Sequence, residues 1–371
     1  MATIFMSMSG EGRGHATRMC SLTEGLKQDH RIVLFAPADA YAFLAPLYVD
    51  DPQVQVVELP GLIFHYVQGK LAVLTSIYEG FRYLRETLDP LVDLLCEWIE
   101  RERPSLIVTD FDPALPRAAM RMGVPFISFT HQHFLLANDL SFLPLDLKIH
   151  AWTMSFGVAA HYRGQFLTIV SSFFKADLRK GYEETIQVGP MIRPDIRSAV
   201  VTEGDYFLSY LRKKTPDSVV KEIVKTGQRV RIYGIGEREP VGNVTFHAVN
   251  PQSFARDLAG TKAILCAAGN QLLGESVFLG KPVFAMPEAA HHEQQINSQF
   301  LRRMGCGDFV TLERFRAEQF LRFVENLGEY RRVIESTYRG REGTGDVVQI
   351  IKTCLNSETL ATAPARQLVG G

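Results

Sequence analysis

The chain opens with a short apolar segment, residues 3–8, that runs directly into a turn containing Gly10, Gly12 and Gly14. A histidine, His15, follows where a helix is expected to begin. This pattern is typical of a buried parallel strand that leads into a helix, and ligands bind at the carboxyl ends of such strands. Glycines there let the backbone turn tightly and approach a ligand without Cβ clashes. The segment therefore predicts an α/β sheet that delivers a titratable base to a crevice.

Two plainer interpretations of this turn stay open. Glycine-rich turns occur in many nucleotide-binding folds, and here the third glycine comes two residues after the second, not three as in the dinucleotide fingerprint. The glycines can therefore be structural only. His15 can likewise be a helix cap or a core residue.

Length and composition limit the class of protein. A chain of 371 residues with 46% hydrophobic and 22% charged residues predicts two globular domains with ample core. A formal net charge of -1 gives no general reason to expect nucleic-acid binding. The five cysteines are scattered without paired spacing, so neither a zinc ribbon nor a disulfide framework is indicated. With no basic leader and no long apolar run, we expect a cytoplasmic protein.

Strand and helix patterns alternate through the first half of the chain, which predicts a parallel sheet with helices on both faces. The expected strands cover residues 3–8, 31–36, 54–59, 105–109 and 125–130, and the expected helices 16–28, 72–103 and 114–122. The Asp89-Pro90 pair is expected to kink or divide the long helix.

The pattern repeats in the second half, after a turn-rich stretch around residues 188–194. We expect an N-terminal domain (1–188), a linker (189–200), a C-terminal domain (201–345) and a C-terminal helix with a frayed tail (346–371), with a cleft between the domains. The expected strands of this half are 206–211, 229–233, 244–248, 263–266 and 282–286.

A second turn of chemical interest follows the expected strand 263–266. Gly269 stands where a helix begins, and the free backbone N–H groups and dipole of a helix start favour a phosphate or diphosphate. Glu275, further along that helix, is placed to accept hydrogen bonds from ribose hydroxyls. Glu293 and Gln294 supply a carboxylate and an amide able to hold the hydroxyls of a sugar, although they can equally form a solvated helix face.

The order of these elements resembles the donor-binding signature of inverting GT-B glycosyltransferases, both the UDP-sugar glycosyltransferases and the peptidoglycan N-acetylglucosaminyltransferase group. The Gly14-His15 turn is similar to the N-terminal glycine-rich loop of the same superfamily. The matching elements are Pro251-Gln252, Gly269, Glu275, Gly280-Lys281-Pro282, Met286-Pro287 and the segment 293–298.

The resemblance implies a GT-B fold, with two Rossmann-like doubly wound domains facing a cleft. It implies an inverting transfer of a sugar from a nucleotide-sugar donor, a UDP-sugar by the same resemblance, to a hydroxyl of a small-molecule, lipid or glycan acceptor. Neither a metal nor another cofactor is expected. A sugar-nucleotide epimerase or hydrolase on the same fold, and a non-catalytic nucleotide-sugar or glycan-binding protein, stay open as alternatives.

By this resemblance His15 is the general base and Asp110 its orienting partner. The physical case agrees, since a neutral imidazole can take the proton of an acceptor hydroxyl and a carboxylate can fix its tautomer. Asp110 follows the strand 105–109 and is expected at the same sheet edge as His15. The resemblance assigns donor contacts to Gly12, Gly14, Gln252, Gly269, Asn270, Gln271, Glu275, His292, Glu293 and Gln294.

The chain departs from the plant-type signature at three positions. Ala267 stands where those enzymes have a histidine before the glycine, and Val249 stands near the place of a tryptophan. Phosphate binding would then depend on backbone amides around Gly269. Glu293 replaces an aspartate, and its longer side chain bears on which sugar fits.

Three further features have competing interpretations. Asp110-Phe111-Asp112 has the form of an Asp-x-Asp metal site, but we favour Asp110 as the partner of His15 and Asp112 as a helix cap. His131 and His133 fit an acceptor-side wall of the crevice better than a metal site. The segment 142–174 is rich in aromatic residues and basic at its edges, which fits domain core or a peripheral contact with the inner face of a membrane.

Overall fold

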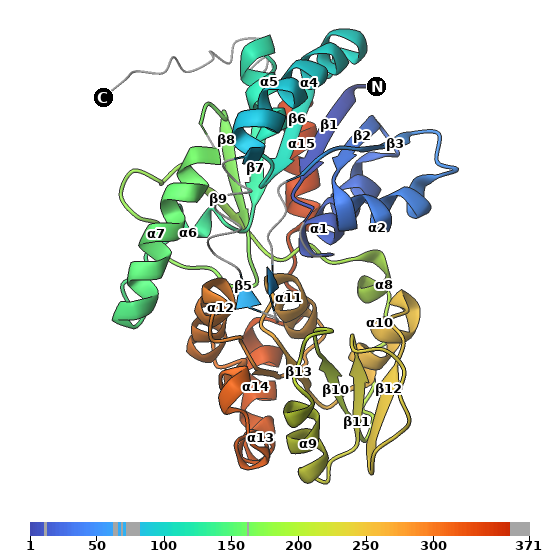
Figure 1. Ribbon diagram of the computed structural model, residues 1–371, viewed down its shortest axis with the longest axis vertical. Helices are drawn as coiled ribbons and strands as arrows, with labels where there is room; N and C mark the ends of the chain where they lie inside the picture. Colours follow the sequence, from blue (N-terminus) through green and yellow to red (C-terminus); the bar gives the residue numbers. More distant parts are fainter. Residues whose placement is uncertain (11–12, 62–65, 68–69, 72–81, 162, 357–371) are drawn as a thin grey trace.

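The computed structural model of the chain describes residues 1–10, 13–61, 66–67, 70–71, 82–161 and 163–356 (Figure 1). Two parallel sheets, one of seven and one of six strands, lie in two halves of the molecule and are each covered by helices on both faces (Figure 1). The predicted GT-B architecture, with two Rossmann-like doubly wound domains, is confirmed.

The seven-stranded sheet has the order β3-β2-β1-β6-β7-β8-β9, so that β1 lies at its centre beside β6. Its strands are β1 (Thr3–Met8), β2 (Arg31–Ala36), β3 (Val54–Glu58), β6 (Leu106–Asp110), β7 (Phe126–Thr130), β8 (Leu167–Ser171) and β9 (Ile186–Val188); β4 (Tyr66–Val67) and β5 (Lys70–Leu71) form a separate antiparallel pair. The helical segments of this half are α1 (Arg13–Leu26), α2 (Ala38–Tyr48), the π-helical η1 (Tyr83–Thr87), α4 (Leu88–Glu102), α5 (Ala114–Met122), α6 (Phe134–Ala137) and α7 (Leu145–His161).

The six-stranded sheet repeats this order as β12-β11-β10-β13-β14-β15, with β10 beside β13. Its strands are β10 (Phe207–Tyr210), β11 (Val230–Tyr233), β12 (Val244–His247), β13 (Ile264–Cys266), β14 (Val283–Ala285) and β15 (Gly307–Phe309). The helices of this half are α8 (Pro194–Arg197), α9 (Asp217–Lys225), α10 (Pro251–Gly260), α11 (Asn270–Phe278), α12 (His292–Arg303), the 3-10 turn η2 (Leu312–Arg314), α13 (Ala317–Glu325), α14 (Leu327–Thr337) and α15 (Thr344–Asn356).

The central strand shows why the sequence folds this way. Along β1, Ile4 and Met6 pack into the core on one face of the sheet, and Phe5 packs into the core on the other. Successive residues of a strand point to opposite faces, so a strand covered by helices on both sides must be apolar throughout. Full burial of such a side chain stabilises the fold by roughly 1.5–3 kcal/mol.

The C-terminal helix α15 crosses back to the first half of the molecule and packs against α1 (Figure 1). Val347 and Ile351 of α15 are fully buried in the core on that side of the first sheet. Gly25 of α1 permits this approach, because a Cβ at that position would lie 2.4 Å from Cγ2 of Val348. The expected C-terminal helix is therefore present, and the tail 357–371 lies outside the described residues.

The two halves share one continuous core on the side of α12. Phe300 of α12 stacks on Phe174 with ring centroids 3.6 Å apart and also meets Phe134 and Phe142 edge to face. These rings come from both halves of the chain, so apolar packing fixes how the two sheets face each other.

The local predictions differ from the structure at short or interrupted elements. The long helix expected at 72–103 is divided by the π-helical turn η1 just before Asp89-Pro90, and residues 72–81 lie outside the described part. Strands β8, β9 and β15 were not expected. β9 and β15 are only three residues long, and Gly307 and Asp308 of β15 do not favour a strand. β8 has the apolar and β-branched composition of a strand and was missed.

Candidate active site

His15 lies in the first turn of α1, at the carboxyl edge of the central strand β1. The backbone after β1 must pass close to Pro37, since a Cβ on Gly10 would lie 2.8 Å from the Pro37 carbonyl oxygen. Gly14 has open space in front of it. The His15 side chain is 13% exposed, so most of it is enclosed and a small part is accessible from outside. Gly12 lies outside the described residues.

Asp110 is the last residue of β6, directly beside the end of β1. The parallel register pairs Met8 with Asp110, and the Ser9 amide donates to the Asp110 carbonyl at 2.9 Å. The Asp110 Oδ2 atom lies 3.0 Å from Nδ1 of His15. The sheet order therefore brings together the two residues that the sequence predicted as a pair.

Arg18 is a third member of this cluster that the sequence did not single out. Its guanidinium makes a direct ion pair with Oδ2 of Asp110, and both side chains are buried. Burial works to raise the pKa of Asp110, but Arg18 and then His15 outweigh it and hold the pKa at about 2. The only sequence signal was spacing: Arg18 stands three residues after His15, on the same helix face.

Asp112, the other carboxylate of the Asp-x-Asp sequence, caps helix α5. Its two oxygens accept hydrogen bonds from the backbone N–H groups of Ala114 at 3.2 Å and Leu115 at 2.9 Å. Phe111 between the two aspartates is left-handed, with φ of 57°, and its ring stacks 6.3 Å from that of His15. This strained residue turns the chain so that Asp110 points to His15 while Asp112 points to α5.

His131 follows β7 and bridges the two halves of the molecule. Its Nδ1 lies 2.7 Å from the Ser172 hydroxyl, and its Nε2 lies 3.3 Å from Oδ1 of Asn297 and 3.9 Å from Oε1 of Glu293 on α12. Burial lowers the pKa of His131 to about 4, against the opposing effect of Glu293. The ring is therefore neutral at neutral pH.

His133 is also buried, with its Nδ1 2.9 Å from the Ser128 hydroxyl. Burial lowers its pKa to about 4. Both rings are buried, and an acceptor contact by His131 or His133 stays a prediction.

Gly269 forms the N-cap of α11, at the carboxyl edge of β13 in the second sheet. Its φ of -68° is ordinary for any residue, and a Cβ there would meet no atom within 4 Å. The open space lies in front of the first N–H groups of the helix, which have no partner inside the helix. Binding of a phosphate at this helix start stays a prediction.

The side chains that follow Gly269 are engaged within the protein. The Asn270 carboxamide accepts from the Phe173 amide at 3.1 Å and donates to the Ser171 carbonyl at 3.4 Å, which ties α11 to the first sheet. The Gln271 side chain donates to the Met191 carbonyl at 2.6 Å. Donor contacts by these two side chains stay predictions.

Glu275 has a partner that the sequence did not reveal. Arg193, in the linker, binds both of its carboxylate oxygens at 2.8 and 3.1 Å, and Glu275 is buried. The Gln271 side chain also donates to Glu275 at 2.9 Å, and the pair with Arg193 joins the expected linker to α11. The expected role of Glu275 as a ribose ligand stays a prediction.

The start of α12 carries the predicted sugar-binding residues. The Glu293 side chain is 22% exposed and faces His131, while the Gln294 side chain accepts from the Glu288 amide at 3.1 Å. The His292 ring stacks on that of His150 of α7 at 3.4 Å between centroids, and burial followed by His150 lowers the pKa of His292. Gln252 lies exposed in the first turn of α10.

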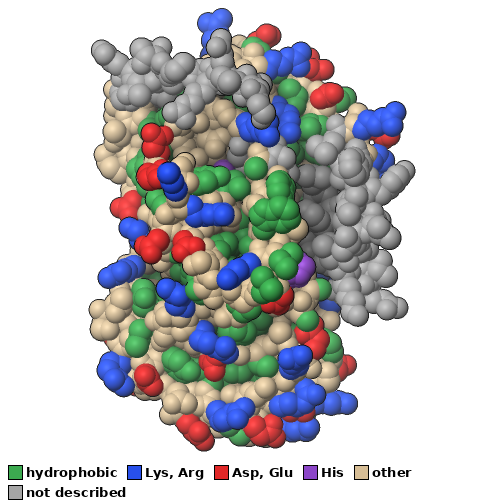
Figure 2. Space-filling model, turned by 90° about the vertical axis from the view of Figure 1, so that its left-hand side faces the viewer, with side chains coloured by type: hydrophobic (Ala, Val, Ile, Leu, Met, Phe, Trp, Pro, Cys, Tyr) green, Lys and Arg blue, Asp and Glu red, His purple; other side chains and the backbone are tan. Residues whose placement is uncertain are grey.

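Helix α7 accounts for much of the aromatic segment 142–174. Its inward side chains belong to the core, whereas an outward stripe is exposed: Leu145, Ile149, Trp152 and Phe156. Figure 2 shows the face of the molecule that carries α7, where hydrophobic side chains lie among lysines and arginines. The peripheral membrane contact stays a prediction.

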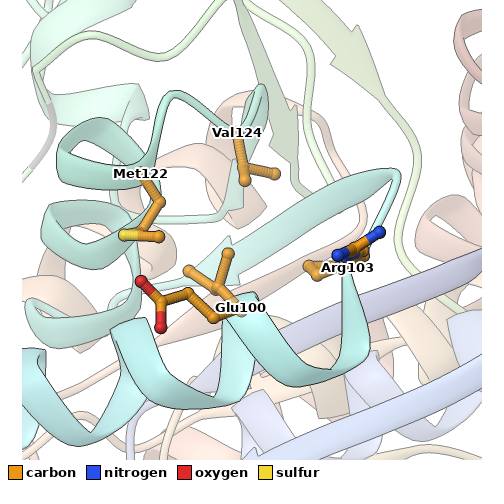
Figure 3. A pocket seen from close by; sticks show the side chains of 6 residues that line it. Glu100, Arg103, Met122 and Val124 are labelled. Atoms are coloured by element: carbon orange, nitrogen blue, oxygen red, sulfur yellow. The ribbon is translucent and has the colours of Figure 1, made fainter.

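The surface hollow in Figure 3 lies away from these residues. It is lined by Ile99, Glu100, Arg103, Pro104, Met122 and Val124. These residues end α4 and α5 or lead into β6 and β7, so the hollow lies at the amino edge of the first sheet. His15 and Asp110 lie at the opposite, carboxyl edge.

Residues 2–328 of the chain match the model of the family described as Glycosyl transferase family 1. The chain belongs to this family. It is therefore a glycosyltransferase, as the donor signature and the Gly14-His15 turn indicated. The chain has no match among curated proteins.

Solved structures of low sequence identity share the glycosyltransferase fold. A UDP-glucosyltransferase from Polygonum tinctorium, in complex with 3,4-dichloroaniline, is 15% identical with a TM-score of 0.69, and the match covers 96% of this chain and 99% of that chain. UGT89C1 of Arabidopsis thaliana, complexed with quercetin, is 14% identical with a TM-score of 0.67 over 95% and 99% of the two chains. LpCGTa, in complex with UDP, is 14% identical with a TM-score of 0.65 over 96% and 100%.

Among the helices of the described residues, none has both the length and the apolar character needed to cross a membrane.

Proposed function

We propose that this glycosyltransferase moves a sugar from a UDP-sugar to a hydroxyl group of its acceptor, with inversion at the anomeric carbon. The observation that carries the proposal is the 3.0 Å approach of His15 Nδ1 to Asp110 Oδ2 at the carboxyl edge of the first sheet. The solved structures with UDP and with quercetin bound support a UDP donor and a small hydroxylated acceptor.

The chemistry begins with a proton transfer. With Nδ1 of His15 held toward Asp110, Nε2 is the nitrogen left to take the proton of the acceptor hydroxyl. The acceptor oxygen then bonds to the anomeric carbon while the bond from that carbon to the diphosphate oxygen breaks. The electron pair leaves with the diphosphate, and Asp110 stabilises the imidazolium.

The leaving diphosphate gains negative charge during this step. The N-terminal N–H groups of α11, behind the open space at Gly269, are placed to stabilise that charge. Glu293, partly exposed at the start of α12, is the side chain we assign to the sugar hydroxyls. Backbone amides, rather than the engaged side chains of Asn270 and Gln271, serve the phosphates.

The mechanism needs no metal ion. Asp112 uses both carboxylate oxygens to cap α5, and Asp110 is paired with Arg18 and His15. The two carboxylates of the Asp-x-Asp sequence therefore make contacts within the protein and are not assigned to a metal ion. Turnover should survive excess EDTA. Asp110→Asn should impair turnover more than Asp112→Asn, whereas complete inactivation by EDTA with rescue by Mn²⁺ would overturn both assignments.

Two measurements, made one after the other, test the proposed function. A thermal-shift screen of nucleotides and nucleotide sugars identifies the donor, because a ligand of the folded state raises the Tm. The product formed from that donor is then examined by ¹H NMR. The proposal requires the opposite anomeric configuration to that of the donor; retained configuration, or release of free sugar without an acceptor, contradicts it.

A further inference from the structure

Arg18 is placed to act on the predicted base without touching a substrate. It stands one helical turn after His15 on α1, and its guanidinium and the His15 ring both approach the same oxygen of Asp110, Oδ2. Its charged end also lies 6.0 Å from the centre of the Phe129 ring, and the Arg18 residue is buried. A buried arginine is rare unless it is paired, and here the pairing is with the partner of the predicted base.

We propose that Arg18 is a positioning residue for the glycosyl transfer: by sharing the Asp110 carboxylate it fixes that carboxylate and keeps the His15 imidazole neutral at neutral pH. This inference rests on the proposed function only for its effect on turnover. The charge arrangement itself can be measured without any assay of activity.

The reasoning starts from the burial of Asp110, which is fully enclosed. A buried carboxylate needs a cation nearby, because burial of an uncompensated charge costs several kcal/mol. If His15 were the only partner, Asp110 would hold a proton on the imidazole and form an ion pair. A protonated His15 cannot accept the proton of the acceptor hydroxyl.

Arg18 removes this conflict because it is charged at every accessible pH. The carboxylate then has a permanent countercharge and can orient the imidazole without having to protonate it. The pKa of Asp110, which burial works to raise and Arg18 and His15 bring down to about 2, agrees with a carboxylate that stays ionised throughout the working range.

The other groups around the cluster do not supply this charge. From the segment after β7, His131 faces Arg18, and its pKa of about 4, set by burial, makes it neutral above pH 5. From α12, Glu293 lies beyond His131 and adds a negative charge, not a positive one. Arg18 is therefore the permanent cation that the described contacts give to Asp110.

The first test measures the titration of the His15 ring by NMR of histidine-labelled protein, with the resonance assigned by its loss in His15→Gln. Arg18→Gln keeps N–H donors toward Asp110 but removes the charge, and Arg18→Lys keeps the charge. We expect the titration midpoint of the ring to rise by about one pH unit or more in Arg18→Gln. It should stay near that of the wild type in Arg18→Lys.

The second test is the pH profile of kcat/KM. The acid limb should move to higher pH in Arg18→Gln by the same amount as the midpoint, with activity recovering at high pH and the donor KM unchanged. Arg18→Lys should restore the wild-type profile. Thermal unfolding of each variant verifies that it is folded, and Arg18→Met is the uncharged substitute if Arg18→Gln does not fold.

A purely structural Arg18 would behave differently. Its uncharged variants would lose activity by the same factor at every pH, with an unchanged ring titration, and this result would overturn the proposal. If instead His15→Gln keeps full turnover, the proposed function fails, while the shift of the ring titration still decides the role of Arg18.

Discussion

The two sheets share one strand order, yet the turns after their equivalent strands β6 and β13 carry different chemistry. In the first sheet, β6 ends at the buried carboxylate of Asp110, which Arg18 and His15 both approach. In the second, β13 leads to Ala267, Ala268 and Gly269, a turn without a charged side chain, while β10 leads to Arg212, which pairs with Glu288. Both sheets present a carboxyl edge where ligands can bind, and the residues at that edge decide the chemistry of each half.

A strained backbone marks the same place in both halves. Phe111 directly follows Asp110 with φ of 57°, and Ala268 directly precedes Gly269 with φ of 62°. Left-handed non-glycine residues cost of order 1–3 kcal/mol and occur where the surroundings fix an unusual turn. We therefore assign proton handling to the first half and diphosphate stabilisation to the second.

The largest expected effect is on the base. His15→Gln should lower turnover by about 100-fold to 10,000-fold while the affinity for UDP is unchanged, because a general base acts on the acceptor proton and not on the nucleotide. Steady-state kinetics and calorimetry measure the two quantities. Comparable losses in turnover and in UDP affinity would remove the distinction between the halves.

The converse substitution is Gly269→Val in the second half. A branched side chain would fill the open space before α11 and keep phosphates from the helix amides, so we expect UDP affinity to fall by about 10-fold to 100-fold, the effect of one or two lost hydrogen bonds to a charged group. Stability should change by less than about 1 kcal/mol. Gly328→Val is the matched control, since Gly328 also has open space beside it at the start of a helix, α14. Unchanged UDP binding in Gly269→Val would place the diphosphate elsewhere.

Glu293→Gln tests whether the sugar and the nucleotide of the donor are bound by different residues. If Glu293 holds sugar hydroxyls, the variant should bind the UDP-sugar about 10-fold more weakly, the effect of one lost hydrogen bond to a charged group, and bind UDP as the wild type does. Calorimetry with both ligands checks this. Equal losses for both ligands would place Glu293 outside the sugar pocket.

A further effect concerns the pH dependence of stability. His131 and His133 have pKa values of about 4 in the folded protein because they are buried, below the ordinary value of 6.5. The unfolded chain thus takes up protons first as the pH falls, so stability is full above about pH 6.5 and should decline by several kcal/mol toward pH 4. Asp110, with its pKa of about 2, adds a further loss only below about pH 4.

Denaturant unfolding at several pH values measures this decline. His133→Asn should flatten it, since the variant has one buried imidazole fewer. A wild-type stability that is constant between pH 6.5 and 4.5 would contradict the assignment of neutral buried rings.

The sequence predicted the fold and the pairing of His15 with Asp110 because both depend on regular features. Apolar runs mark the long strands, and residues at the ends of neighbouring parallel strands must meet at one edge. The three-residue strands β9 and β15 carry too little pattern to be recognised, whereas β8 has the composition of a strand and was missed.

Contacts between segments distant in the chain could not be predicted from the sequence. The bond of Asn270 to the Phe173 amide joins residues 97 positions apart, and His131 meets Asn297 across 166 positions. Such contacts depend on how the two sheets are placed, which local patterns do not encode. For the same reason the Arg193 partner of Glu275 and the pairing of Arg18 with Asp110 appeared only in the structure.

The central claim is that His15 and Asp110 handle the proton as one unit. A double-mutant cycle of turnover with His15→Gln, Asp110→Asn and the combined variant measures this directly, with circular dichroism to verify folding. Groups that act as a unit are strongly non-additive, so the combined variant should be no slower than the slower single variant. Losses that multiply in the combined variant would show that the two residues act independently and would contradict the claim.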